Sequence, residues 1–367
     1  MKQTNGRLQS IDTLRGFDMC WIMGIPGIIY ALYNIFGGET LKSCWDQMEH
    51  VPWNGFHLMD MVFPLFLFIA GVSFPFSLAK RRNKEAKDSA LYLHLIKRTG
   101  ILILLGFIYN GWLNMDVSTF RFASVLAHIG LAWCFGSILY MNFRNKRMLG
   151  LIIILILIGY ALLNALVLAP DALGTNPLLP ENNIVAWFDR QFLPGVLYNK
   201  IYDPEGWLTL IPAISTALIG MLTGDYLRRD SVSPSLKTIV LLSTGFAMLI
   251  VSLLVNMVIP FNKALWSSSF VLLTGGISIL LMASFYWIID VRQYKKWTFF
   301  FRVIGLNSIF IYMAQQIIDF TGITSFFLGG LGHVLQSFQP LILSCGYVAV
   351  CWLLLYFLYR KNIFIKV

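Results

Sequence analysis

Long hydrophobic runs, separated by short polar segments, recur along the whole chain. Each run holds about 20 residues, which is the length that an α-helix needs to cross the hydrocarbon core of a bilayer. The runs predict ten membrane-spanning helices, at residues 14–36, 59–79, 96–113, 122–142, 148–169, 207–227, 238–259, 266–289, 299–318 and 339–359. The stretches 183–200 and 318–338 leave room for an eleventh span or a re-entrant segment. We therefore expect an all-α polytopic membrane protein, with residues 1–367 forming a single integral-membrane domain.

Composition agrees with this pattern. Of the 367 residues, 57% are hydrophobic and only 13% are charged. Soluble domains carry about 25% charged residues, so the composition excludes an ordinary soluble protein. The sequence contains no Walker loop and no H-E-x-x-H motif, and its five cysteines lack metal-ligand spacing. We therefore expect no metal cofactor.

Lys and Arg are distributed unevenly between the two predicted sides of the membrane. Of 28 such residues, five fall on the side opposite the N-terminus, and the remaining 23 lie on the N-terminal side. The five are Lys42, Arg121, Arg190, Lys200 and Lys263. By the positive-inside rule, both termini are then cytoplasmic. Topology and contact with anionic membrane lipids account for the net charge of +10, so no nucleic-acid partner is expected.

Two segments on the predicted outer face are long enough to form a cap over the helices. They are residues 37–58 and residues 170–206. The second is rich in Pro, Asn and aromatic residues, and its apolar content favours a folded cap over a loose linker. Together the segments are expected to roof a cavity.

The stretch HVPWNGFHLMDMVFPLFLFIAGVSF, residues 50–74, concentrates polar groups at the start of a predicted span. His50 can act as base, acid or acyl acceptor, and Asp60 can orient its imidazole. Trp53 and Asn54 can stack on a sugar and hydrogen-bond to it. The structural alternatives are an interfacial histidine, a carboxylate favoured by a helix N-terminus, and a tryptophan of the interfacial belt.

Other polar residues lie in or beside predicted spans. Arg15 is spaced to share a helix face with Asp12 and Asp18, either as a structural ion pair or as a ligand contact. His128 lies in the fourth span, where it lines a cavity or satisfies a neighbouring helix. The remaining candidates are Asn262 and Lys263 at the start of the eighth span, and Asn307 and Ser308 in the ninth. Polar groups in such helices also serve as hydrogen bonds between helices.

Six segments, taken in order, resemble the transmembrane acetyltransferase family of heparan-α-glucosaminide N-acetyltransferase and its bacterial relatives, often labelled DUF5009 or NagX-like. They are RLQSIDTLRGFDM, HVPWNGFHLMDMVFPLFLFIAGVSF, RFASVLAHIGLAW, YDPEGWLTLIPAISTALIGMLTGDYL, FNKALWSSSFVLLTGG and GLNSIFIYMAQQ. The resemblance implies transfer of an acetyl group from cytosolic acetyl-CoA to a glucosamine amine across the membrane. The alternative function is an inner-membrane transporter of N-acetylglucosamine or a related amino sugar.

The family places its active-site histidine in the motif H-x-x-W-N-G-x-x-x-x-D, so the resemblance implies a catalytic role for His50. We assign Asp60 and Asn54 as its catalytic partners, with Asn54 or backbone N–H groups near Gly55 stabilising the oxyanion. The other assignments are Trp53, Asn262, Lys263 and Asn307 for the acceptor, and Arg15, Asp18, His128 and Ser308 for coenzyme A. Both an acyl-imidazole intermediate and direct attack fit, and we favour direct attack.

The resemblance also carries expectations about context. The extra N-terminal luminal domain of the animal enzyme has no counterpart in this sequence, which points to a bacterial inner (cytoplasmic) membrane protein. Its acceptor is then an amino sugar on the periplasmic side rather than heparan sulfate. The expected partners are coenzyme A, the acceptor sugar and membrane lipids, and the family allows a homodimer.

Overall fold

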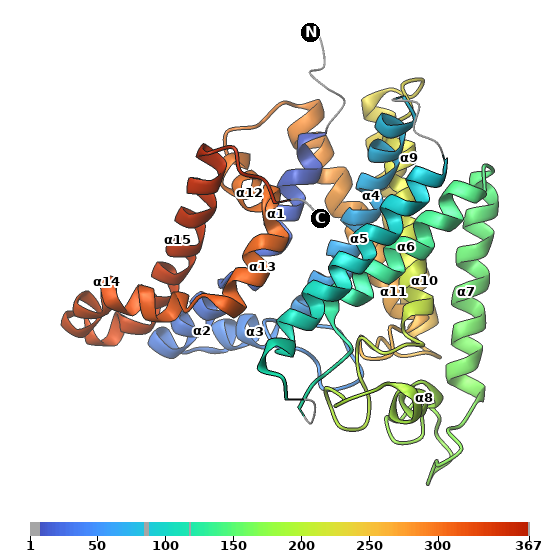
Figure 1. Ribbon diagram of the computed structural model, residues 1–367, viewed down its shortest axis with the longest axis horizontal. Coiled ribbons are helices and arrows are strands. Elements are labelled where there is room, and N and C mark those ends of the chain that lie inside the picture. Colours follow the sequence, from blue (N-terminus) through green and yellow to red (C-terminus); the bar gives the residue numbers. More distant parts are fainter. Residues whose placement is uncertain (1–7, 84–87, 117–118, 366–367) are drawn as a thin grey trace. The chain divides into compact units, whose positions relative to one another are not determined.

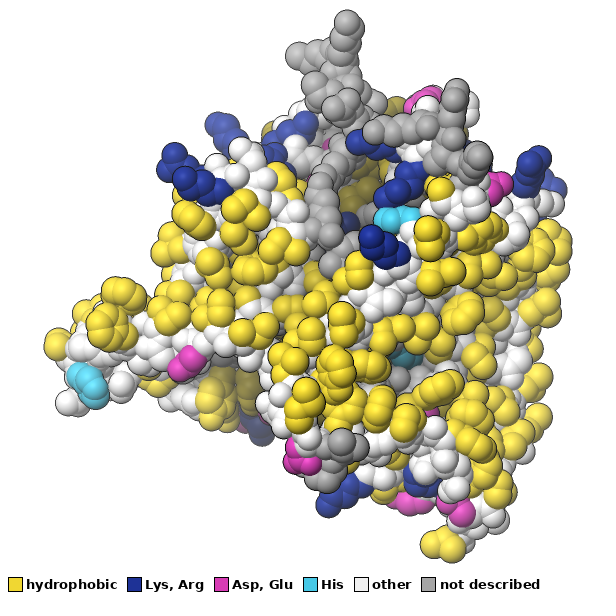
Figure 2. Space-filling view, viewed as in Figure 1, with side chains coloured by type: hydrophobic (Ala, Val, Ile, Leu, Met, Phe, Trp, Pro, Cys, Tyr) yellow, Lys and Arg dark blue, Asp and Glu magenta, His cyan; other side chains and the backbone are white. Residues whose placement is uncertain are grey.

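The computed structural model describes residues 8–83, 88–116 and 119–365, and helices joined by loops make up most of these ranges (Figure 1). Five members of the predicted basic side, Lys2, Arg7, Lys84, Lys87 and Lys366, lie outside the described residues. Figure 2 shows that hydrophobic side chains cover much of the visible surface. Exposed apolar side chains in such numbers are typical of a protein that contacts lipid.

Eight helices of the described chain are long and apolar enough to cross a membrane. They are Leu58–Arg82 (η1 Leu58–Met61 and α4 Val62–Arg82), α5 (Asp88–Tyr109), α6 (Val125–Asn142), α7 (Lys146–Leu166), α9 (Leu210–Leu227), α10 (Pro234–Asn256), Ser268–Val291 (α11 Ser268–Phe285 and η3 Tyr286–Val291) and Gln336–Arg360 (η4 Gln336–Phe338 and α15 Gln339–Arg360). Each matches a span predicted from hydropathy.

The other two predicted spans are broken helices. α1 (Gln9–Ile22) and α2 (Ile25–Phe36) meet at 47°, and α12 (Thr298–Leu306) and α13 (Ser308–Ile317) meet at 70°. Gly24 separates the first pair with φ +133°, a conformation that glycine adopts readily. The count is therefore eight unbroken spans, or up to ten if each bent pair is one span. The side on which each end lies stays a prediction.

The two stretches considered for an eleventh span form shorter helices. α8 (Ile184–Phe192) has 9 residues and α14 (Phe320–Val334) has 15, fewer than the roughly 20 that a span requires. The remaining short elements are α3 (Glu39–Asp46) and η2 (Trp112–Asn114).

The Cα positions of the chain group into two compact units. The single integral-membrane domain expected from the sequence stays a prediction. The central unit comprises Pro52–Phe56 and Phe63–Ser284 of the described chain. The terminal unit comprises Leu8–Val51, His57–Val62 and Phe285–Val367. The chain passes between the units at both ends of 52–56, before Phe63, and after Ser284.

In the central unit, glycines let helices α4 and α9 approach closely. A Cβ at Gly220 would lie 2.2 Å from the carbonyl oxygen of Phe68, and one at Gly71 would lie 2.4 Å from that of Ala217. In a lipid environment the hydrophobic effect does not drive helices together, so close van der Waals packing at small residues stabilises such crossings. Helices α5, α6, α7, α10 and α11 complete this bundle, and α8 with its flanking loops lies at one end of it (Figure 1).

The terminal unit joins the two ends of the chain. α1 packs on α12, where a Cβ at Gly16 would lie 1.7 Å from the carbonyl oxygen of Phe301. Asp290 binds the start of α1 by accepting from the backbone N–H groups of Gln9 and Ser10, both at 3.1 Å. α15 packs on α2, α12 and α14. The first and last helices therefore share one core.

Candidate functional site

The segment that leads to Asp60 is held by backbone and side-chain hydrogen bonds within the terminal unit. Gln47 accepts from the N–H of Leu58 through its side chain at 3.1 Å and from the N–H of Met59 through its carbonyl oxygen at 3.1 Å. His57 Nδ1 lies 3.0 Å from the carbonyl oxygen of Glu49. These contacts hold residues 47–49 against residues 57–59 at the start of the 3-10 turn η1.

Asp60 lies in η1 and pairs with His50. Its Oδ1 is 2.7 Å from His50 Nδ1, and its Oδ2 accepts the N–H of His57 at 3.0 Å. The Asp60 side chain is fully buried, whereas the His50 side chain is 47% exposed. A buried carboxylate thus fixes an imidazole that reaches solvent.

This pair has the geometry of a general base and its orienting group. An ionised carboxylate only accepts hydrogen bonds, so Nδ1 of His50 is the donor and the basic lone pair lies on Nε2. A carboxylate in this position holds the reactive tautomer and stabilises the imidazolium that forms during proton transfer. The arrangement suits proton abstraction or acyl transfer at Nε2.

The strap Pro52–Phe56 belongs to the central unit and is tied to its loops. Trp53 Nε1 donates to the carbonyl oxygen of Leu178 at 2.9 Å, and its ring packs against Tyr202 with centroids 4.7 Å apart. Asn262 Nδ2 donates to Asn54 Oδ1 at 3.1 Å. The structure therefore brings together Trp53, Asn54 and Asn262, three of the residues that the sequence suggested for catalysis or acceptor binding.

The backbone of the strap affects one of the oxyanion assignments. The Gly55 N–H donates to the carbonyl oxygen of Phe261 at 2.8 Å, and Gly55 has φ +127°. This N–H is therefore engaged in holding the strap. The side-chain amide of Asn54, which is exposed, is the better donor for an oxyanion.

A charged cluster beside the strap was not anticipated from the sequence. Arg121 pairs with both Asp203 and Glu205, and its Nε donates to Asp203 Oδ2 at 2.7 Å. Burial opposes ionisation of Arg121, but its bonds to the two carboxylates outweigh burial and raise the pKa of the guanidinium. Burial raises the pKa of Glu205, and the charges of Arg121 and Lys263 counteract part of that rise. Lys263 therefore lies close enough to Glu205 to influence its ionisation.

A second buried acid, Asp189, lies in the last turn of α8. Its Oδ1 accepts the N–H of Trp207 at 3.1 Å, and its Oδ2 has no hydrogen-bond partner among the described residues. Burial raises the pKa of Asp189 to about 7. A Cβ at Gly206 would lie 2.0 Å from Oδ2, so a larger residue there would force the Asp189 carboxyl group to move.

The four residues suggested for coenzyme A fall in different parts of the chain. His128 is buried in the central unit, where its ring packs against Trp266 and Phe63 with both centroid distances 5.4 Å. Arg15, Asp18 and Ser308 belong to the terminal unit. Arg15 lies 3.7 Å from Asp12, whereas the buried Asp18 oxygens have no hydrogen-bond partner among the described residues. Their role in cofactor binding stays a prediction.

Asn307, suggested for the acceptor, makes structural contacts in the terminal unit. It donates to the carbonyl oxygen of Ile363 at 3.0 Å and accepts from the N–H of Ile365 at 2.8 Å. Both bonds anchor the segment after α15 at the break between α12 and α13. This contact explains a polar side chain there without a ligand, and the acceptor role stays a prediction.

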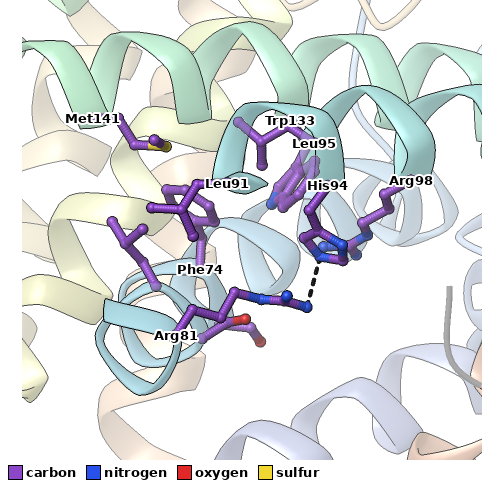
Figure 3. Close-up of a pocket in the computed structure, with 11 residues that line it drawn as sticks. Phe74, Arg81, Leu91, His94, Leu95, Arg98, Trp133 and Met141 are labelled. Carbon is purple, nitrogen blue, oxygen red and sulfur yellow. Dashed lines mark hydrogen bonds between the residues drawn. The ribbon is translucent and has the colours of Figure 1, made fainter. Parts of the chain in front are cut away.

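The sequence signals for the missed groups were weak. In the sequence, Arg121 is one of five Lys or Arg residues on the predicted outer side. Its acidic partners lie 82 and 84 residues later in the chain. His94 lies in a basic stretch of sequence that does not suggest a site, yet it lines a pocket with two arginines (Figure 3). An arginine on the side with few cations, with D-P-E-G later in the sequence, is the cue that could have suggested such a pair.

Helices long and apolar enough to span a membrane, together with a histidine held by a buried carboxylate, characterise a polytopic membrane protein with a His–Asp pair. The family model described as heparan-alpha-glucosaminide N-acetyltransferase, catalytic, matches residues 7–250, and this chain belongs to that family. The match contains both His50 and Asp60.

Two curated relatives carry the same description. Heparan-alpha-glucosaminide N-acetyltransferase of Homo sapiens is 26% identical over 419 residues, which cover 98% of this chain and 60% of the human protein. The Mus musculus protein of that name is 25% identical over 429 residues, covering 100% of this chain and 61% of its own length. The chain thus spans about 60% of the length of these relatives.

Proposed function

We propose that this chain is a membrane N-acetyltransferase that moves the acetyl group of acetyl-CoA to the amine of a glucosamine-type sugar. The observation that carries the proposal is the buried Asp60 carboxylate, 2.7 Å from the Nδ1 atom of a half-exposed His50, in a chain of this family. The names of the relatives favour acetyl transfer and do not favour the transporter alternative.

The chemistry requires one proton to leave the acceptor. The amine nitrogen attacks the thioester carbon, Nε2 of His50 takes a proton from that nitrogen, and the carbon–sulfur bond breaks as the amide forms. The departing thiolate receives the proton and leaves as coenzyme A. Asp60 keeps Nδ1 protonated throughout, and the Asn54 amide donates to the oxyanion. Direct attack needs no acyl-histidine intermediate, and we favour it.

The two substrates approach from opposite sides in this proposal. Basic groups gather on the predicted cytoplasmic side, where they can hold the phosphates of coenzyme A. Trp53, Asn54, Asn262 and Lys263 are proposed contacts of the sugar, because indole faces and amides suit stacking and hydrogen bonding to hydroxyl groups. The chain then works in a bacterial inner membrane on a periplasmic acceptor, so that the acetyl group crosses and the cofactor does not.

The test is direct acetylation by the purified protein. Radiolabelled acetyl-CoA and a panel of amino sugars should give N-acetylated product with the wild-type chain. His50→Ala should reduce the rate to background while the protein still inserts into the membrane. His333→Ala, a change at an exposed histidine, should keep the wild-type rate. Turnover by His50→Ala at the wild-type rate would reject His50 as the catalytic group.

A further inference from the structure

Helix α1 carries a buried carboxyl group to which the terminal unit offers no hydrogen-bond donor. Asp18 is 1% exposed, and neither of its oxygens is hydrogen-bonded within the described chain. Arg15, one turn earlier on α1, lies 3.7 Å from Asp12. An ionisable group buried in an apolar helix is costly unless it is compensated, and such groups mark functional sites in membrane proteins. Asp18 therefore requires a partner that the described residues do not supply.

A second buried oxygen without a donor lies on α13, which packs against α1 (Figure 1). Gln315 Nε2 donates to the carbonyl oxygen of Ile22 at 3.3 Å and to the hydroxyl group of Tyr347 at 3.0 Å. Its Oε1 is buried and accepts no hydrogen bond from any described residue. Ile22 lies one helical turn after Asp18 on α1, so the Asp18 oxygens and Gln315 Oε1 lie on the same contact between two helices.

Both helices that carry these oxygens adjoin a break. α1 ends at Ile22, just before the 47° bend into α2, and α13 begins at Ser308, just after the 70° bend from α12. A broken helix leaves backbone carbonyl groups without their usual helical partners. In membrane proteins such breaks occur where the backbone lines a cavity, and freed carbonyl groups there coordinate ions. The break one turn after Asp18 can therefore supply further oxygen ligands.

The chemistry of these atoms favours a cation as the missing partner. A carboxylate and an amide oxygen only accept hydrogen bonds. A proton on Asp18 would create an O–H group that itself needs an acceptor, and no described group lies within hydrogen-bond distance of either oxygen. Hard cations, by contrast, bind carboxylate and carbonyl oxygens directly. The described residues contain no group of three or more His, Cys, Asp and Glu side chains that could hold a metal ion, so one carboxylate suits a monovalent ion.

We infer that Asp18 and Gln315 form a binding site for a monovalent alkali cation in the terminal unit. The Asp18 carboxylate balances the charge of the ion, and the Gln315 oxygen ties the ion to α13. The bound ion thereby joins α1 to α13. This role is an alternative to contact with coenzyme A, and it does not depend on acetyl transfer.

Equilibrium binding of radioactive Na⁺ to the purified full chain in nanodiscs tests the inference, with choline chloride keeping the ionic strength constant. We expect saturable binding to the wild type, and competition by K⁺ and Li⁺ identifies the preferred ion. Asp18→Asn should weaken Na⁺ binding about tenfold or more, because it removes the countercharge of the ion in a medium of low dielectric constant. Asp12→Asn, a change on the same helix, should alter binding less than about twofold.

A second matched pair tests the ligand from α13. Gln315→Met removes the buried amide oxygen, while Gln316→Met removes an exposed amide at the next position. We expect Gln315→Met to weaken Na⁺ binding about threefold or more and Gln316→Met to leave it unchanged. Thermal unfolding is an independent measurement. Replacing choline chloride with NaCl should raise the unfolding temperature of the wild type, of Asp12→Asn and of Gln316→Met, but not of Asp18→Asn.

Two outcomes would overturn the inference. One is a folded wild-type chain with no saturable response to Na⁺, K⁺ or Li⁺ in either measurement, and this outcome does not depend on whether any variant folds. The other is equal ion binding by Asp18→Asn and Asp12→Asn. Neither measurement contains acetyl-CoA or sugar, so a chain that binds Na⁺ but transfers no acetyl group would reject the enzyme and keep the cation site.

Discussion

Asp60 is the residue on which the orientation of His50 depends. Asp60→Asn keeps the size of the side chain but replaces a charged acceptor with a neutral amide. The amide no longer holds the proton on Nδ1 of His50, and it no longer stabilises the positive charge that forms on the imidazole. We expect kcat for acetyl transfer to fall about 10²–10⁴-fold, with KM changed far less. Initial rates over a range of both substrates measure the two constants separately. A variant with kcat close to that of the wild type would show that the carboxylate has no catalytic role.

Asp189 makes stability depend on pH. Burial raises its pKa from 3.8 to about 7, so the folded chain binds a proton that the unfolded chain has lost between these values. The contribution of this group to stability is therefore full below pH 3.8, declines as pH rises, and is lost above about pH 7. Asp189→Asn removes the ionisable group while keeping an oxygen for the Trp207 N–H.

We expect Asp189→Asn to raise the unfolding temperature relative to the wild type at about pH 8.5, and the difference to shrink at about pH 5. Asp171→Asn is the control, because its side chain is 46% exposed and pairs with Arg190. Thermal unfolding at the two pH values measures both differences. A gap that grows towards acid pH would contradict the assignment.

At the residue scale, the sequence predicted the His50–Asp60 pair because both residues lie in one short motif. The contact between Asn54 and Asn262 joins positions 208 residues apart, and no local pattern reports such a pairing. The Arg121 cluster was missed for the same reason. His94 was missed because a single histidine near a basic loop resembles an ordinary surface residue, and only folding brings it beside Arg81.

Helix contacts in the central unit depend on glycine at a few positions. Gly220 in α9 has no room for a Cβ beside Phe68 of α4, whereas Gly159 in α7 has no neighbour within 4 Å of that position. Gly220→Ala should therefore destabilise the fold by about 1–3 kcal/mol through overpacking. Gly159→Ala should be neutral or stabilise by up to about 1 kcal/mol, because alanine favours the helix.

Unfolding of the two alanine variants in a denaturing detergent series measures this difference directly. The two substitutions add the same methyl group to a membrane helix, so the comparison isolates packing from helix propensity. Equal stability of the two variants would mean that α4 and α9 are not in close contact.

At the element scale, hydropathy predicted the spans but not their breaks. A window of 20 residues senses how apolar a segment is, and it is insensitive to the direction of the backbone. The bend at Gly24 depends on a positive φ, and the bend at Asn307 on bonds to residues 363 and 365. Each bend is set at one residue inside an otherwise continuous apolar run, so hydropathy does not detect it.

For the whole molecule, the uneven distribution of Lys and Arg predicts which loops face the cell interior. Cys44 is exposed and should lie outside, whereas Lys295 lies in a loop predicted to be cytoplasmic. In chains with one cysteine each, a membrane-impermeant maleimide should label Cys44 in intact cells. It should label the Lys295→Cys variant only after permeabilisation. The opposite pattern would invert the topology and remove the basis for a cytosolic donor.

The pairing of α1 with α12 also sets an order of events during synthesis. The N–H of Gln9 bonds to Asp290, 281 residues later in the chain. At 5–20 residues per second, a ribosome needs about 15–60 s to make that stretch. Throughout that interval the first helix resides in the bilayer without its final neighbour, although it carries Asp12, Arg15 and Asp18. The insertion machinery or an early, temporary helix contact must shelter those charges until the late helices emerge.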